Sequence, residues 1–115
     1  GTSVSLLGVA YKGGVSDTRE SPALRLIRHL EEAGVGDLRA SDPYADDDSF
    51  DRKLLSLEES LDGSDAVVIV TDHPEYGAFD PAVFAERMEG RAIVDTRAML
   101  DTERWGAAGF DVYSV

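Results

Sequence analysis

The chain has 115 residues, a length that corresponds to one domain and excludes a multidomain enzyme. Its 23 Asp and Glu against 11 Lys and Arg give a net charge of −12, which disfavours binding to nucleic acid or to an anionic membrane. Cysteine is absent, so disulfides, thiolate metal sites and a cysteine nucleophile are excluded within this sequence. No apolar run approaches the roughly 20 residues that span a bilayer, and no signal-peptide pattern is present, so we expect a cytoplasmic protein.

The charged residues are dominated by two residue types. Nine of the 11 basic residues are arginines, and 14 of the 23 acidic residues are aspartates. We hypothesise a halophilic protein in a high-salt cytosol, where carboxylates keep the surface hydrated and screening suppresses their repulsion. The alternative is a protein that is merely acidic, and composition does not separate the two.

The first third of the chain predicts a strand, a helix and a strand. Val4–Ala10 (VSLLGVA) is a nearly continuous apolar run, typical of a strand that is buried on both faces. Ser21 is expected to cap a helix that begins at Pro22, carries apolar residues at helical spacing and ends at Gly34. A brief strand over Leu38–Ser41 follows.

The middle of the chain continues the alternation. A polar loop with three consecutive aspartates comes first, and we interpret it as solvated rather than as a metal site. Ser56 and Glu59 match the capping box of a short helix that Gly63 ends. Ala66–Thr71 (AVVIVT) is β-branched and apolar, and it is the strongest strand pattern in the sequence.

The last third predicts two further helix and strand pairs. The first helix begins at Asp80 and Pro81 and ends at Gly90, with Val83, Phe84 and Met88 in the core. A strand over Ala92–Asp95 follows it. The second pair is a helix over Met99–Ala107 and a strand over Phe110–Val115. Strands separated by helix-length spacers indicate parallel pairing. We therefore predict one α/β domain over residues 1–115, a three-layer α/β/α fold with a five-stranded, mostly parallel, Rossmann-like sheet.

Candidate binding residues follow from this fold, because open parallel sheets bind ligands beyond the carboxyl ends of their strands. Tyr11, Lys12 and Arg19 follow the first predicted strand, and Arg97 follows the fourth. The cations Lys12, Arg19 and Arg97 are suited to an anionic ligand. The alternative is that each pairs with a nearby carboxylate, such as Asp17, Glu20 or Asp95, and the sequence leaves the two open.

Other chemistries find little support. The glycines near the first strand match neither a P-loop nor the dinucleotide fingerprint G-x-G-x-x-G. His29 is expected on the surface, whereas His73 is either a ligand contact or a turn residue. Two scattered histidines form no metal site, and no nucleophile elbow is present. Trp105 is expected in the core near the last strand.

Four motifs follow one another over almost all of the chain, namely Gly8–Leu24 (GVAYKGGVSDTRESPAL), Ser41–Tyr44 (SDPY), Ser64–His73 (SDAVVIVTDH) and Ile93–Arg97 (IVDTR). In this order they resemble the UDP-glucose/GDP-mannose dehydrogenase family. The segment is similar to the C-terminal, UDP-binding domain of that family. Residues 19–23 (RESPA) and 71–73 (TDH) look more like the UDP-N-acetylhexosamine (mannosaminuronate-type) branch of the family than its UDP-glucose branch.

The resemblance implies an NAD-dependent oxidation of the C6 alcohol of a UDP-sugar to a carboxylate, a reaction of polysaccharide biosynthesis. It also implies partner segments, namely an N-terminal NAD-binding domain and a central helical segment with the catalytic cysteine, in an enzyme that forms a homodimer. By position, Lys12 and Tyr11 would contact the nucleotide sugar, Arg97 its pyrophosphate or uridine side, and Arg19 the NAD side of the cleft.

The departures from the family limit what this chain does alone. It has neither the cysteine nor the glycine fingerprint, so it holds no catalytic residue and cannot perform the reaction by itself. Gly13 and Gly14 also replace the family's commoner Pro-Asn after Lys12, which loosens that loop. A free-standing, non-catalytic nucleotide-binding module is the alternative. A signalling receiver is set aside, since the acidic pair after the first strand and the lysine after the fifth are missing.

Overall fold

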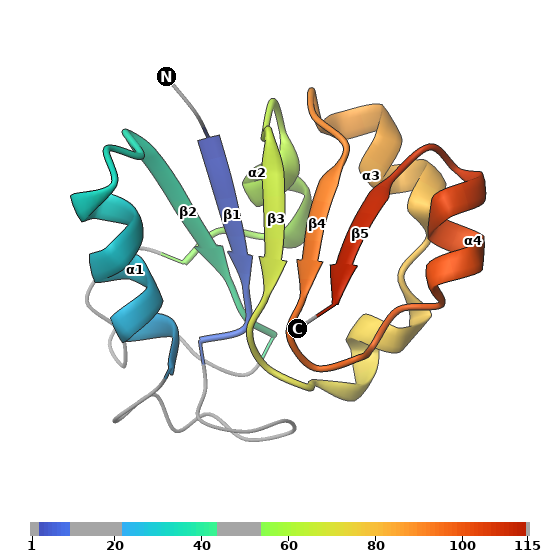
Figure 1. The fold of residues 1–115 in the computed structure, drawn as a ribbon, viewed down its shortest axis with the longest axis horizontal. Coiled ribbons are helices and arrows are strands. Elements are labelled where there is room, and N and C mark those ends of the chain that lie inside the picture. Colours follow the sequence, from blue (N-terminus) through green and yellow to red (C-terminus); the bar gives the residue numbers. More distant parts are fainter. Residues whose placement is uncertain (1–2, 10–21, 44–53, 115) are drawn as a thin grey trace.

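A parallel sheet forms the middle of the molecule (Figure 1). The computed structural model describes residues 3–9, 22–43 and 54–114. All neighbouring strands are parallel, and their order across the sheet is β2-β1-β3-β4-β5. The strands are β1 (Ser3–Leu7), β2 (Asp37–Ser41), β3 (Ala66–Ile69), β4 (Ala92–Asp95) and β5 (Asp111–Ser114). The predicted five-stranded parallel α/β architecture is confirmed.

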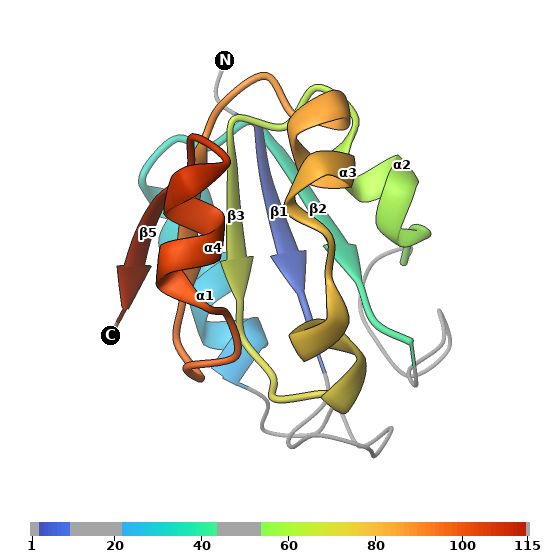
Figure 2. The ribbon, with the colours of Figure 1, turned by 90° about the vertical axis from the view of Figure 1, so that its right-hand side faces the viewer.

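Helices cover both faces of this sheet (Figure 2). α1 (Pro22–Glu32) packs on one face through Ile27, which joins a cluster with Val4, Leu6 and Val68. The opposite face holds the other elements, which are α2 (Leu57–Leu61), the 3₁₀ helix η2 (Pro74–Ala78), α3 (Pro81–Arg87) and α4 (Thr102–Ala107). The three layers arise because alternate residues of each buried strand point to opposite faces.

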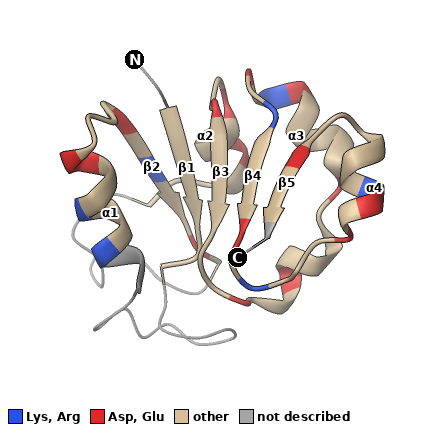
Figure 3. Cartoon of the chain, viewed as in Figure 1, with Lys and Arg blue, Asp and Glu red and all other residues tan. Residues whose placement is uncertain are grey.

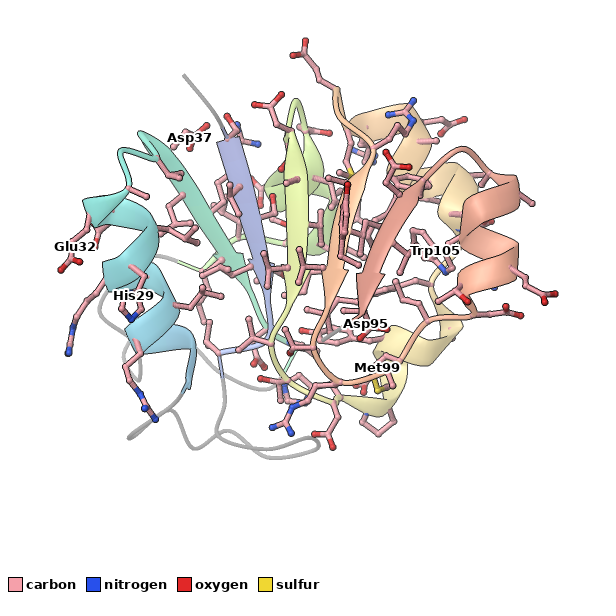
Figure 4. The ribbon with its side chains drawn as sticks, viewed as in Figure 1. His29, Glu32, Asp37, Asp95, Met99 and Trp105 are labelled. Carbon is pink, nitrogen blue, oxygen red and sulfur yellow. The ribbon has the colours of Figure 1, made fainter. Side chains whose placement is uncertain are left out.

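The larger core lies under α2, α3 and α4, and aromatic rings run through it. Neighbouring rings lie between 4.9 and 5.2 Å apart, centroid to centroid, in the order Tyr76, Phe79, Phe84, Trp105 and Phe110. Trp105 is 1% exposed and meets the rings on both sides edge to face (Figure 4). The prediction that Trp105 belongs to the core near the last strand is confirmed.

Side-chain caps begin three of the helices. Ser56 and Glu59 form the predicted capping box of α2, with each side chain accepting the other's backbone N–H. Asp80 accepts from Ala82 N at the start of α3, with Pro81 in the first turn as predicted. Asp101 accepts from two backbone N–H groups at the start of α4. The predicted cap Ser21 lies outside the described residues.

Some predicted boundaries and core contacts are wrong. The helix predicted over Met99–Ala107 begins only at Thr102, since the aspartate cap at Asp101 defines its start. Phe84 and Met88 are buried as predicted, but Val83 is 37% exposed. α3 ends at Arg87, before Gly90.

Two departures have a local steric cause. A Cβ on Gly90 would lie 1.9 Å from the Asp65 carbonyl oxygen, so glycine serves close backbone packing there instead of a helix stop. β1 ends at Leu7, three residues before the predicted Ala10, because Gly8 turns the chain with φ +96°.

η2 was not predicted at all, because its sequence PEYGA has no apolar periodicity.

Candidate functional site

The order of the strands places a crevice at the carboxyl edge of the sheet. β1 leads through α1 to β2 on one side, whereas β3 lies on the other side of β1 and leads to β4 and β5 (Figure 1). The strand order therefore reverses between β1 and β3. In open α/β sheets, ligands bind at this switch point, outside the carboxyl ends of the strands.

Asp95 organises the turn that leaves β4 at this edge (Figure 4). Its side chain is 1% exposed, and its two oxygens accept backbone N–H groups from Arg97 at 3.1 Å and Leu100 at 2.9 Å. Thr96 ties the same turn to the end of β3, donating from Oγ1 to the Ile69 carbonyl at 2.6 Å. The backbone that carries Arg97 is therefore held from two sides.

Arg97 presents its guanidinium to solvent at the edge of the crevice. Its Nε donates to the Val70 carbonyl oxygen at 3.3 Å, and the residue is exposed. Within residues 3–9, 22–43 and 54–114, the guanidinium forms no ion pair. The predicted pairing with Asp95 is wrong, since the Asp95 oxygens are occupied by backbone N–H groups. The other predicted partners, Asp17 and Glu20, lie outside the described residues. As far as the described residues go, Arg97 remains available for an anion.

A cavity of about 330 Å³ lies beside Arg97, between α1 and the ends of β3 and β4. Its described walls are Leu26, Val70, Thr96 and Arg97, so it is apolar with one cation and one hydroxyl. Small-molecule sites usually measure about 300–1,000 Å³, so this volume suits part of a nucleotide rather than a whole nucleotide sugar.

On the other side of the crevice, Asp42 links the exits of three strands. Its Oδ2 accepts the Val9 backbone N–H at 2.8 Å and lies 2.8 Å from His73 Nε2. Both the His73 and Asp42 side chains are fully buried. Of the two alternatives for His73, the structure confirms the turn residue, since its carbonyl oxygen accepts the Tyr76 N–H at 3.0 Å at the start of η2 and its ring is bonded to Asp42.

A second cavity, of about 260 Å³, opens on the face of the sheet that carries α2 and η2. Asp42 and Tyr76 are among its described walls. The buried Tyr76 hydroxyl has no hydrogen-bond partner in the part of the chain that the structure describes. Burial, with the negative charges of Asp42 and Glu75, raises the pKa of Tyr76 well above its usual value. Tyr76 is therefore a neutral phenol at any physiological pH.

The structure tests only part of the predicted site. Arg97 lies at the carboxyl edge as expected, while Tyr11, Lys12 and Arg19 lie outside the described residues. His29 is on the surface of α1, as predicted (Figure 4). The sequence analysis missed the Asp42 and His73 pair, although both residues stand within the recognised motifs at strand ends.

Two features are absent from the described residues. No group of three or more His, Cys, Asp or Glu side chains there is arranged to hold a metal ion. None of the described helices combines the length and the apolar character needed to cross a membrane.

Residues 5–102 match the model of the UDP-glucose/GDP-mannose dehydrogenase family, UDP binding domain. The chain belongs to this family. The match takes in most of the chain and confirms the resemblance inferred from the four sequence motifs.

Named relatives within the family are dehydrogenases of nucleotide sugars. The chain is 40% identical over 113 residues to UDP-N-acetyl-D-mannosamine dehydrogenase of Methanocaldococcus jannaschii, covering 96% of this chain and 26% of the relative. It is 31% identical to UDP-glucose 6-dehydrogenase of Rickettsia bellii, covering 100% of this chain and 28% of the relative. The chain therefore spans about a quarter of the length of these enzymes.

Solved structures agree. The UDP-D-ManNAc dehydrogenase of Pyrococcus horikoshii superposes with a TM-score of 0.84 at 33% identity, over 99% of this chain and 25% of that one. The NDP-N-acetyl-D-galactosaminuronic acid dehydrogenase of Methanosarcina mazei superposes with a TM-score of 0.92 at 22% identity, over 100% of this chain and 24% of that one, which supports the fold. The Rossmann-like architecture is thus shared with family enzymes.

Proposed function

We propose that this chain binds the UDP moiety of a nucleotide sugar at the carboxyl edge of its sheet. The observation that carries the proposal is Arg97, whose guanidinium has no ion pair among the described residues and stands beside a 330 Å³ cavity at the carboxyl edge of the sheet. A guanidinium matches the geometry of a phosphate in two parallel hydrogen bonds. In a chain of net charge −12, an available arginine at this edge favours an anionic ligand.

The proposed parent protein is an NAD-dependent UDP-sugar 6-dehydrogenase, in which this chain is the C-terminal domain. Its substrate class is UDP-N-acetylhexosamine, with UDP-N-acetylmannosamine first, because the 40% identical relative is named for that sugar. We further propose that the enzyme is a cytoplasmic homodimer that supplies uronate units for polysaccharide synthesis.

The residue content of the chain decides which steps of the reaction we assign to it. Without cysteine, it supplies no thiolate nucleophile, and no G-x-G-x-x-G follows β1, so its residues do not form the usual dinucleotide turn. We place NAD and the reacting groups in the N-terminal and central segments, with Arg19 as the contact from this chain toward NAD. Here Lys12, Tyr11 and Arg97 hold the nucleotide, so that binding energy orients the sugar for hydride transfer.

The test is a titration of the natural polypeptide that contains these 115 residues with UDP, UDP-N-acetylmannosamine and GDP. Backbone amide NMR shifts of selectively labelled protein report where each ligand binds. We expect UDP and the UDP-sugar to shift Val70, Thr96 and Arg97 at lower concentration than GDP. Shifts confined to other parts of the sheet, or equal responses to all three ligands, would contradict the proposed site.

Arg97→Ala should weaken UDP binding by about 10- to 150-fold, which corresponds to about 1.5–3 kcal/mol for a lost charge-assisted contact. Arg104→Ala is the matched control, because Arg104 is also an exposed arginine that donates one 3.3 Å hydrogen bond to a backbone carbonyl, that of Phe79. Isothermal titration calorimetry measures both dissociation constants. Equal affinities for the two variants would remove Arg97 from the binding site.

We also propose that the acidity of the chain is an adaptation to salt. Red segments are spread over the helices and strand ends in Figure 3, and most of the described Asp and Glu residues are exposed. Molar KCl should screen this repulsion and raise the melting temperature of the chain by about 5 °C, equivalent to roughly 1 kcal/mol. Circular dichroism in low salt and in molar KCl measures the change, and an unchanged melting temperature would reject the adaptation.

A further inference from the structure

The α1 side of the sheet is covered over only part of its width. Ile27 of α1 packs with Leu6 of β1 and Val68 of β3, so the helix lies over that half of the sheet. In Figure 1, β4 and β5 have no described helix across them on this side. On the other side α3 and α4 cover the same strands, and Ile93 of β4 is fully buried in the cluster with Trp105. The described elements therefore cover β4 and β5 on one face alone.

The uncovered side chains are mostly apolar. Val94 packs at the margin of the α1 cluster, and Ala92, two residues earlier on β4, points the same way. Their neighbours on β5 are Tyr113, which pairs with Val94, and Asp111, which pairs with Ala92. These four residues make up the bare face. Tyr113 is 55% exposed, whereas all-parallel sheets occur almost only with both faces covered. We therefore expect the bare face to be covered in the natural polypeptide.

The bare face has the width that one helix needs. Strands lie about 4.8 Å apart and packed helices about 8–10 Å apart, so one helix covers about two strands. α1 fills the place over β1 and β2, and the next place on this side lies over β4 and β5. Leu26 of α1 and Thr96, which follows β4, line the same cavity, so α1 forms one wall of this place. A second helix would pack against α1 and the bare face together.

The segment that precedes β1 fits this place. The chain spans about a quarter of the length of its relatives, and the proposed function makes it the C-terminal domain, so most of the natural polypeptide comes before residue 1. β1 begins at Ser3 in the middle of the sheet. A helix that enters β1 through a short connection runs antiparallel to the strands. Because α1 occupies the β2 side, this helix would lie over β4 and β5.

Charge at the amino edge indicates how such a helix would end. Asp111 is exposed at the start of β5, and its carboxylate forms no ion pair among the described residues. The helix would finish at this edge, and Lys or Arg is favourable in the last turn of a helix. A basic side chain there would meet Asp111.

We propose that the bare face is the docking surface for an amphipathic helix, formed by the residues immediately before residue 1 in the natural polypeptide. Its aliphatic stripe packs on Val94 and Tyr113, and a basic residue of its last turn pairs with Asp111. This inference rests on the part of the proposed function that makes the chain a C-terminal domain. It goes beyond that function because the start of the helix stands at the carboxyl edge, beside the cavity that Arg97 lines.

Photo-crosslinking in the natural polypeptide tests the proposal. Tyr113→p-benzoylphenylalanine keeps an aromatic ring at the bare face and reacts with the C–H groups that it touches. Irradiation and mass spectrometry should identify a cross-link to the same polypeptide, within about 20 residues before residue 1. Val83 is the matched control, because it is also an exposed large apolar residue but lies on α3, across the sheet. The same substitution there should give no cross-link to that segment.

Hydroxyl-radical footprinting of the unmodified natural polypeptide gives a second measurement that needs no variant. Tyr76, which is 3% exposed, serves as the internal reference for a buried tyrosine. A docked helix should make Tyr113 react about as slowly as Tyr76. A rate several-fold higher than that of Tyr76 would mean that nothing covers the bare face, and it would overturn the proposal.

The cross-link also separates the preceding segment from other occupants. A link from Tyr113 to a second copy, or to a different part of the same polypeptide, would overturn the proposal even if Tyr113 were protected. Titration with UDP tests the proposed function independently. UDP binding without the expected cross-link would overturn the docking surface alone, whereas the cross-link without UDP binding would leave the helix in place and reject the nucleotide function.

Discussion

Gly8→Ala is expected to lower the free energy of unfolding of the chain by about 3 kcal/mol or more, the largest loss we foresee from adding a single methyl group. Two effects combine at this position. Gly8 has φ +96°, a conformation that strains any L side chain, and an added Cβ would lie 2.5 Å from the Thr71 Cβ and 2.9 Å from the Thr71 backbone nitrogen. Because Thr71, two residues after the end of β3, is 1% exposed, it has no free space into which to move.

The chain offers a matched control for this substitution. Gly109 has the same φ of +96°, but a Cβ there would meet nothing within 4 Å. Gly109→Ala should therefore show only the backbone strain, about 1 kcal/mol. Urea unfolding of both variants, followed by circular dichroism, measures the two losses. Equal losses would mean that the contact with Thr71 contributes nothing.

Asp95→Ala is expected to destabilise the chain by about 3–4 kcal/mol, because two backbone N–H groups lose a charged acceptor. Asp95 is 1% exposed, and its oxygens hold Arg97 N at 3.1 Å and Leu100 N at 2.9 Å. The turn between them includes Ala98, which has φ +54° and needs such support. Losing the carboxylate should also reduce UDP affinity, since the same turn carries Arg97.

Asp101→Ala is the control for this prediction. Asp101 also accepts two backbone N–H groups, from Glu103 at 3.1 Å and Arg104 at 3.3 Å, but the residue is exposed at the start of α4. Water can replace its oxygens, so the loss should be about 1 kcal/mol, that of an ordinary helix cap. Urea unfolding compares the two variants, and a smaller loss for Asp95→Ala than for Asp101→Ala would contradict the buried role of Asp95.

The sequence predicts most of the fold because its buried strands have a distinctive composition. Ala66–Thr71 and Ala92–Asp95 are short β-branched runs between turn residues, and helix-length spacers between such runs indicate parallel pairing. Helix starts with a side-chain cap, such as Ser56 and Asp80, were also predicted, because capping depends on a few adjacent residues.

What the sequence does not reveal depends on contacts between distant segments. Gly90 was interpreted as a helix stop. Instead, glycine is required at position 90 because the carbonyl of Asp65, 25 residues earlier, leaves no room for a side chain. Asp95 was expected as a possible partner of a cation, but it binds the backbone of its own turn. His73 and Asp42 are 31 residues apart, and no local pattern indicates that they pair.

The position of β1 has a consequence for how the chain acquires its structure. Residues near the amino end form the middle of the sheet, where Val4 pairs with Leu38 on one side and with Ala66 on the other. The second of these pairings closes a loop of about sixty residues, and long loops slow the search for the native topology. On a ribosome, β1 would emerge before β3, so until β3 is made β1 exposes an unsatisfied edge for which a chaperone or a neighbouring copy could compete.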